Sequence, residues 1–151
     1  MIWKIRCKLI YWLSIGILAC GAYLSGLISV MLYYPYKVID IQQPIEIISS
    51  GNIVISGEDI LLHVKYHKYK DVSAEVYYQL YNHDTKIYYS LKTESSNLPM
   101  EQCGIIKGIN IPKYVRAGTY SMVITIVYRI NAIRVITYKA KSEKFMLVDS
   151  L

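Results

Sequence analysis

The stretch LIYWLSIGILACGAYLSGLISVMLYYPY, residues 9–36, contains no charged side chain and dictates the surroundings in which the rest of the chain folds. A helix of about 20 apolar residues crosses the hydrocarbon core of a bilayer, which is roughly 30 Å thick. Trp12 and Tyr33 lie 21 residues apart, and a helix would separate them by about 31 Å. Aromatic rings with a polar tip prefer the two headgroup boundaries. The sequence therefore predicts one transmembrane helix over residues 9–36, ended by Pro35.

The charges on either side of this stretch predict its orientation. Lys4, Arg6 and Lys8 precede it without any acidic residue, whereas all 11 acidic residues follow it. Basic residues accumulate on the cytoplasmic side of membrane helices. We therefore expect a single-pass protein of the inner (plasma) membrane. Its predicted parts are a cytoplasmic tail at 1–8, a short linker at 37–45 and a periplasmic or extracellular domain at 46–151.

Two cleaved forms compete with this uncleaved anchor. Residues 16–20, Gly-Ile-Leu-Ala-Cys, resemble a bacterial lipobox, and that resemblance implies a mature chain lipidated at Cys20. The sequence stays apolar from Ala22 to Leu32, however, where mature lipoproteins usually turn polar. A secretory signal has a shorter apolar core, of roughly 7–15 residues. An uncleaved anchor is favoured, and lipidation of Cys20 stays open.

Small residues lie along one face of the predicted helix. Such a stripe lets two helices approach closely in lipid, although small residues are also simply common in membrane helices. The predicted helix-packing residues are Gly21, Ala22, Ser25, Gly26 and Ser29. They would allow a homo-oligomer or contact with another membrane protein.

Residues 46–151 alternate between apolar and polar side chains with a period of two, which is typical of strands with one face on a core. Turn-forming residues separate the runs, as at Asn82-His83-Asp84. About seven such runs in one small domain predict an all-β antiparallel sandwich. The predicted strands are 45–56, 60–68, 73–82, 86–93, 103–111, 118–131 and 133–148, the last with a break near Ser142.

One local motif adds a family resemblance. Arg116-Ala117-Gly118-Thr119-Tyr120 resembles the corner of immunoglobulin-like domains, where a tyrosine hydroxyl returns to nearby backbone. The resemblance implies an immunoglobulin-like sandwich in which Tyr120 and Gly118 are structural residues. The disulfide of antibody-type domains is absent from this pattern, because Cys103 is the only cysteine after residue 36. Cys103 is either buried and inert or a free thiol.

The sequence offers no catalytic constellation. On a strand, His63 and His67 lie about 13 Å apart, too far to bind one metal ion at about 2 Å each. His83 and Asp84 have no nearby nucleophile in the sequence. Neither a phosphate-binding glycine loop nor a nucleophile elbow occurs. We therefore expect a non-enzymatic protein without catalytic residues, cofactor or metal.

Tyrosine and basic residues are the best candidates for a binding surface. The chain has 16 tyrosines, and tyrosine buries a large area at low entropic cost. The predicted partner surface is Tyr77, Tyr81, Tyr88, Tyr89, Arg129 and Arg134. The basic residues gather as Lys65, Lys68 and Lys70, and as Arg129, Arg134, Lys139, Lys141 and Lys144. Alternatively, the tyrosines only stabilise the sheet as cross-strand pairs.

These observations favour a membrane-anchored extracytoplasmic binding module of the cell envelope. Its expected partners are the lipid bilayer and an envelope protein or anionic envelope polymer, and nucleic acid is not expected. The chain lacks both an Asn-X-Ser/Thr glycosylation sequon and a disulfide framework, which favours a bacterial or phage-encoded protein. The alternative is a small membrane regulator that acts through helix–helix association, with its outer domain as a sensor or plug.

Overall fold

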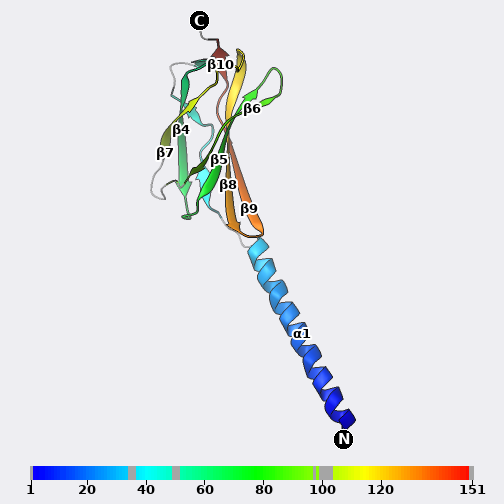
Figure 1. The fold of residues 1–151 in the computed structure, drawn as a ribbon. Coiled ribbons are helices and arrows are strands. Elements are labelled where there is room, and N and C mark those ends of the chain that lie inside the picture. The colour runs from blue at the N-terminus through cyan, green and yellow to red at the C-terminus, as the bar shows by residue number, and fades with distance from the viewer. Residues whose placement is uncertain (1, 34–36, 49–51, 97, 99–103, 150–151) are drawn as a thin grey trace. The chain divides into compact units, whose positions relative to one another are not determined.

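The computed structural model consists of one long helix followed by a domain of β-strands (Figure 1). It describes residues 2–33, 37–48, 52–96, 98 and 104–149, with the backbone alone for residues 2–10. The helix falls in one compact unit, and most of the β domain, residues 37–130 and 135–151, falls in another.

The N-terminal helix, α1, runs over Ile2–Tyr33. Its segment Tyr11–Tyr33 is long and apolar enough to cross a membrane, which agrees with the helix predicted there. α1 begins seven residues before the predicted start at Leu9, because Lys and Arg favour helix and no breaker precedes the apolar run. The predicted stop at Pro35, with Tyr34 and Tyr36, lies outside the described residues.

The smaller sheet of the β domain is built around β4 (Asp59–Lys68). Two short strands, β1 (Ile39–Ile41) and β2 (Glu46–Ile47), pair with successive parts of β4. The strand β7 (Gly104–Asn110) also pairs with β4, from Asp59 to Lys65. All three pairings are antiparallel, as predicted for the whole domain.

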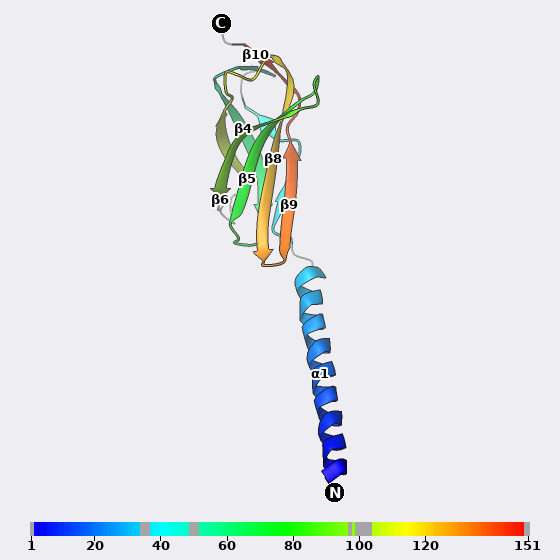
Figure 2. The same cartoon turned by 45° about the vertical axis from the view of Figure 1, so that its right-hand side comes forward.

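The larger sheet has β8 (Gly118–Asn131) at its centre, beside β5 (Ala74–Asn82), which in turn pairs with β6 (Tyr88–Ser96). Two strands pair with β8 as well, β9 (Arg134–Lys141) and β10 (Phe145–Val148). Figure 2 shows β6, β5, β8 and β9 side by side. The break between β9 and β10 falls at Ser142, where the sequence predicts it.

One strand pair departs from the predicted antiparallel arrangement. β3 (Ile53–Ile55) runs parallel to β10, with Met146 opposite Ile53, and Ile45 forms a parallel bridge with Ser142. Hairpin turns force neighbouring strands to be antiparallel, but β3 and β10 are separated by most of the domain. The sandwich is therefore mixed, and the prediction of a purely antiparallel sandwich does not hold for this pair.

The segment predicted as a linker contributes to the fold. Residues 37–45 contain β1, and both Val38 and Ile39 are fully buried. The predicted strand 45–56 is likewise divided into β2 and β3, which belong to different sheets. The apolar run in residues 37–45 is short and interrupted by Pro44. Its periodicity is therefore too weak to predict a strand.

The core lies between the two sheets and is made by the apolar positions of the alternating strands. Ile60 and Leu62 of β4 are fully buried, as are Leu80 of β5 and Met122 of β8. Each such side chain contributes about 1.5–3 kcal/mol when it leaves water. The alternation therefore also decides which side chains remain on the outer faces.

Asn82 shapes the hairpin between β5 and β6, the turn predicted at Asn82-His83-Asp84. Its side-chain oxygen accepts hydrogen bonds from the amides of Asp84 and Thr85, at 2.8 and 2.9 Å. Lys86 completes the turn with a positive φ of 63°. This tight reversal places Tyr81 of β5 directly opposite Tyr88 of β6.

A tyrosine closes the connection that leads into β8. The buried Tyr120 donates a hydrogen bond from its hydroxyl to the carbonyl of Arg116, at 2.9 Å. Burial raises the pKa of Tyr120, so the hydroxyl keeps its proton. At Gly118 a β-carbon would lie 3.3 Å from the Asp84 carboxylate, which leaves little room for a side chain.

We expect Tyr120→Phe to fold normally but to lose about 1 kcal/mol of unfolding free energy, because the hydrogen bond from the buried ring to the Arg116 carbonyl is lost. Urea unfolding of the full chain in mild detergent measures the loss. Exposed Tyr114→Phe is the matched control and should leave the midpoint unchanged. Equal stability of the Tyr120→Phe variant and the wild type would show that this bond contributes nothing.

Candidate interaction surfaces

The outer face of the larger sheet carries three of the tyrosines predicted to bind a partner. Tyr77 and Tyr81 alternate along β5 with the buried Tyr78 and Leu80. Tyr88 pairs with Tyr81 across the strands and is 57% exposed.

Tyr89, the fourth of these tyrosines, faces the other way. Its ring centroid lies 6.1 Å from that of the buried Tyr120. Of the adjacent pair Tyr88 and Tyr89, the outward residue is therefore Tyr88.

Aromatic and cationic side chains meet at one end of this face. The rings of Tyr81 and Tyr88 lie 4.8 Å apart, and the His83 ring meets Tyr81 edge-on at 5.0 Å. The Lys141 ammonium stands 4.7 Å from the centre of the Tyr81 ring, where the π face attracts a cation. We call Tyr81, His83, Tyr88 and Lys141 the tyrosine–lysine cluster.

His83 adds a neutral polar group to the tyrosine–lysine cluster. Its Nε2 atom lies 2.9 Å from the hydroxyl oxygen of the buried Ser121. Partial burial lowers the pKa of His83, and the nearby charges of Lys141, Lys144 and Lys86 lower it further. His83 is therefore neutral at neutral pH, and the positive charge of this region comes from lysine.

Tyr77 and Arg129 form a separate group on the same face. The Tyr77 hydroxyl donates to one carboxylate oxygen of Glu75 at 2.8 Å, and Arg129 approaches the other at 3.6 Å. The hydrogen bond to Glu75 raises the pKa of Tyr77. Arg134 begins β9 and is half-buried. The predicted surface is thus divided into two groups, and the cation beside Tyr81 is Lys141 and neither of the two predicted arginines.

Sequence reasoning did not connect His83 and Lys141 with the tyrosines. Lys141 belongs to the basic residues noted in the sequence, but it is far from Tyr81 along the chain. Only the arrangement of β5, β8 and β9 brings the two together. For His83 a signal existed, because it continues the outward alternation of Tyr77 and Tyr81.

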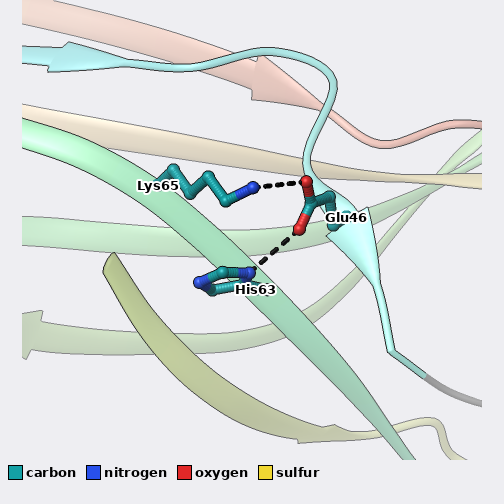
Figure 3. A network of polar contacts seen from close by, with 3 residues as sticks. All are labelled: Glu46, His63 and Lys65. Carbon is teal, nitrogen blue, oxygen red and sulfur yellow. Dashed lines mark hydrogen bonds and ion pairs between the residues drawn. The ribbon is translucent and has the colours of Figure 1, made fainter. Parts of the chain in front are cut away.

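The smaller sheet carries a polar network on its outer face. Figure 3 shows the Glu46 carboxylate between Lys65, whose ammonium donates at 2.6 Å, and His63, whose Nδ1 lies at 2.9 Å. The hydrogen bonds from Lys65 and then His63 lower the pKa of Glu46. Because a carboxylate only accepts, His63 must carry a proton on Nδ1, and its Nε2 is the acceptor in the neutral ring.

A groove of about 740 Å³ lies beside this network, between β1, β4 and the start of β7. Gly104 leaves it open, since a β-carbon there would lie 3.0 Å from His63 Nε2. Asp40, on its rim, is paired with Lys37 at 2.9 Å. Most of the charged groups around the groove are therefore already engaged with one another.

His63 and His67 do not cooperate in this groove. His63 is bonded to Glu46, whereas the His67 ring packs edge-on against Tyr69 at 4.6 Å. Among the described residues, no group of three or more His, Cys, Asp or Glu side chains could hold a metal ion.

Lys68, noted in the sequence as part of a basic group, is not a surface residue. Its side chain is fully buried, and its ammonium donates to the carbonyl of Leu98 at 2.6 Å. Asp71 lies 3.6 Å away and offsets part of the charge. A buried cation needs such partners, so Lys68 contributes to the fold and not to a cationic face.

Glu94 of β6 connects the two sheets. Lys107 of β7 approaches its carboxylate at 2.8 Å, Lys92 at 3.0 Å, and the Tyr78 hydroxyl donates to it at 3.0 Å. Burial alone would raise the pKa of Glu94, but the bonds from Lys107, Lys92 and Tyr78 outweigh it and lower the pKa. Burial, followed by the bond to Glu94, raises the pKa of Tyr78 strongly.

The predicted packing residues of α1 are all exposed. A β-carbon added at Gly21 or Gly26 would meet nothing within 4 Å, and the Ser29 hydroxyl donates to the Ser25 carbonyl at 2.8 Å. This face could therefore admit a second helix closely. Cys20 is also exposed and carries a free thiol, whereas Cys103 lies outside the described residues.

Comparison with known proteins adds no family to this description: no protein-family model and no curated protein sequence matches the chain. What the protein does must be inferred from its own residues and contacts.

We expect Glu94→Gln to destabilise the domain at pH 7 by about 1 kcal/mol, since the negative charge that strengthens the bonds from Lys107, Lys92 and Tyr78 is lost. The lowered pKa means that ionised Glu94 stabilises the fold above its unfolded pKa of about 4.3. That contribution disappears as the pH falls through the lower folded pKa. Urea unfolding of both proteins should show a difference that shrinks between pH 7 and pH 3. A difference independent of pH would contradict the assignment.

Proposed function

We propose that this chain is a non-enzymatic, single-pass membrane protein whose β domain binds a partner outside the cytoplasm, in a bacterial or phage-encoded cell envelope. The apolar segment Tyr11–Tyr33 supports the anchor. Lys4, Arg6 and Lys8 support a cytoplasmic N-terminus. The first strand begins at Ile39, soon after the helix, so the tether is short. A short tether raises the effective concentration of the domain at the membrane.

We propose that the β domain is immunoglobulin-like. β4 and β7 are neighbours in one sheet, and β5, β8 and β9 are neighbours in the other. This pairing resembles strands B–E and C–F–G of immunoglobulin-like domains. The hydrogen bond from Tyr120 to the Arg116 carbonyl also supports the proposal, because it resembles a tyrosine corner.

The tyrosine–lysine cluster is the observation that carries the binding proposal. It presents the exposed Tyr88 ring beside Tyr81, with the Lys141 ammonium against the Tyr81 ring. Protein interfaces are enriched in tyrosine, and a few rigid aromatic anchors supply most of their binding energy. An envelope protein or an anionic envelope polymer fits such a surface, whereas cofactor or metal chemistry has no support in these residues.

A photoreactive amino acid at position 88 should capture a specific partner in intact membranes, because this side chain is central to the proposed surface. The matched control is position 106, an exposed isoleucine on the outer face of the smaller sheet. Mass spectrometry identifies what is captured. Capture of the same species from both positions, or of nothing from either, would contradict the proposed surface.

A second candidate function is regulation of another membrane protein through the face of α1 that carries Gly21, Ser25 and Ser29. The small residues along this face support it, because they would let a second helix approach closely in lipid. Exchanging residues 9–33 for an unrelated apolar helix separates the two functions. Capture from position 88 survives the exchange if the β domain binds the partner and is lost if the helix does. A mature chain that begins at an acylated Cys20 would instead identify a lipoprotein.

Protease added outside sealed cells or spheroplasts should digest the chain beyond residue 37 and leave the anchor with residues 1–8 protected. The basic N-terminal flank is the physical reason, since it favours the cytoplasmic side. An epitope at each end, detected by immunoblotting, reports the outcome. A protected C-terminal epitope in sealed cells, exposed only after lysis, would reverse the orientation.

A further inference from the structure

The strongest unexplained feature is an uncompensated group of cations around the tyrosine–lysine cluster. Lys86, Lys141 and Lys144 are exposed and all act electrostatically on His83. Within the described part of the chain, none of the three forms an ion pair. Seven ion pairs occupy other basic side chains. This end of the larger sheet therefore keeps the positive charge of these three lysines.

Nearby acidic groups do not cancel this charge. Asp84 is the acid that opposes the lysines at His83, and one of its oxygens accepts a hydrogen bond from the Thr119 amide at 3.2 Å. Glu143, next to Lys144 in sequence, lines a separate cavity of about 190 Å³ with Pro44 and Glu46. Among the charges that act on His83, Asp84 thus opposes the three lysines.

Aromatic rings lie beside these lysines and fix the position of one of them. Tyr81 is held between Tyr88, His83 and the Lys141 ammonium, at 4.8, 5.0 and 4.7 Å. A lysine held against a ring loses less conformational freedom on binding than a free one. Tyr88 remains 57% exposed, with a hydroxyl that can donate to an anion. The surface therefore combines a preorganised cation, two further cations and an accessible aromatic ring.

We propose that the tyrosine–lysine cluster, with Lys86 and Lys144, binds an acidic polypeptide surface through carboxylate groups placed beside Tyr88. The proposal rests on the proposed binding function and names the chemistry of its partner. Tyrosine anchors with complementary charge are characteristic of protein–protein contacts. Adsorption to anionic lipid draws instead on clusters of about 4–8 basic residues, and the group here is smaller and partly fixed in place.

The test uses the full chain in nanodiscs of uncharged phosphatidylcholine, with fluorescent poly-L-glutamate as the probe. At about 0.15 M salt long-range attraction is screened. We expect Lys141→Gln and Tyr88→Ala each to raise the Kd about tenfold. Lys144→Gln is a second lysine variant in case Lys141→Gln folds poorly. Lys113→Gln is the matched control, because Lys113 is exposed and does not act on His83, and its effect should stay below about twofold.

An equal loss of affinity in Lys113→Gln and Lys141→Gln would overturn the proposal, because net charge alone would then explain binding. Tighter binding to phosphatidylglycerol vesicles or to heparin, dependent on Tyr88 and Lys141, would also overturn it in favour of lipid or glycan. Failure of the proposed function is a different result, namely no capture from position 88. A captured partner whose yield is unchanged by Lys141→Gln would refute the acidic contact and leave the binding module standing.

Discussion

Pairing along the 14-residue strand β8 is the constraint on which the rest of the β domain depends. β8 pairs with β5 over nine residues from Ala74 to Asn82 and also with β9 and β10. Its inward side chains, such as Met122 and Ile124, are buried against the smaller sheet. A slip of one residue would exchange the faces of the strand. The register of β8 therefore determines which of its side chains are buried in the core and which lie on the outer face.

The two sheets are held together by packing and polar contacts. A disulfide within the β domain is impossible, because Cys103 is its only cysteine. Tyr120 ties the connection before β8 to Arg116, and Glu94 joins β6 to Lys107 of β7. Parallel pairing of β3 with β10 adds a further strand to the edge of the larger sheet. These contacts connect the strands that carry the outer faces, and a preordered surface loses little entropy on association.

The two outer faces differ in whether the lysine at each candidate surface is paired with a carboxylate. On the smaller sheet, Glu46 forms an ion pair with Lys65 and a hydrogen bond with His63. The polar side chains beside the groove are therefore largely bonded to one another. On the larger sheet, Lys141 is held by a ring instead of a carboxylate and keeps its full charge available. This contrast, more than the amount of tyrosine, is the reason why we propose the tyrosine–lysine cluster as the surface for a partner.

Short-range patterns determined much of this protein by themselves. The uncharged run predicts the apolar helix that covers Tyr11–Tyr33, and the period-two alternation predicts the long strands β4, β5 and β8, because both follow from local burial. The hairpin at Asn82 and the break at Ser142 also follow from local residue types. Local reasoning could further tell that one tyrosine of each adjacent pair faces outward.

Only the tertiary structure decided how distant segments combine. The weak apolar pattern of 37–45 did not reveal β1, and the parallel partner of β10 comes from the other end of the domain. Likewise, Tyr88 and not Tyr89 is outward, Lys68 is buried, and Lys141 reaches Tyr81. Such outcomes depend on strand order and register, which are set by long-range packing. A linear sequence displays local periodicity directly but contains those pairings only implicitly.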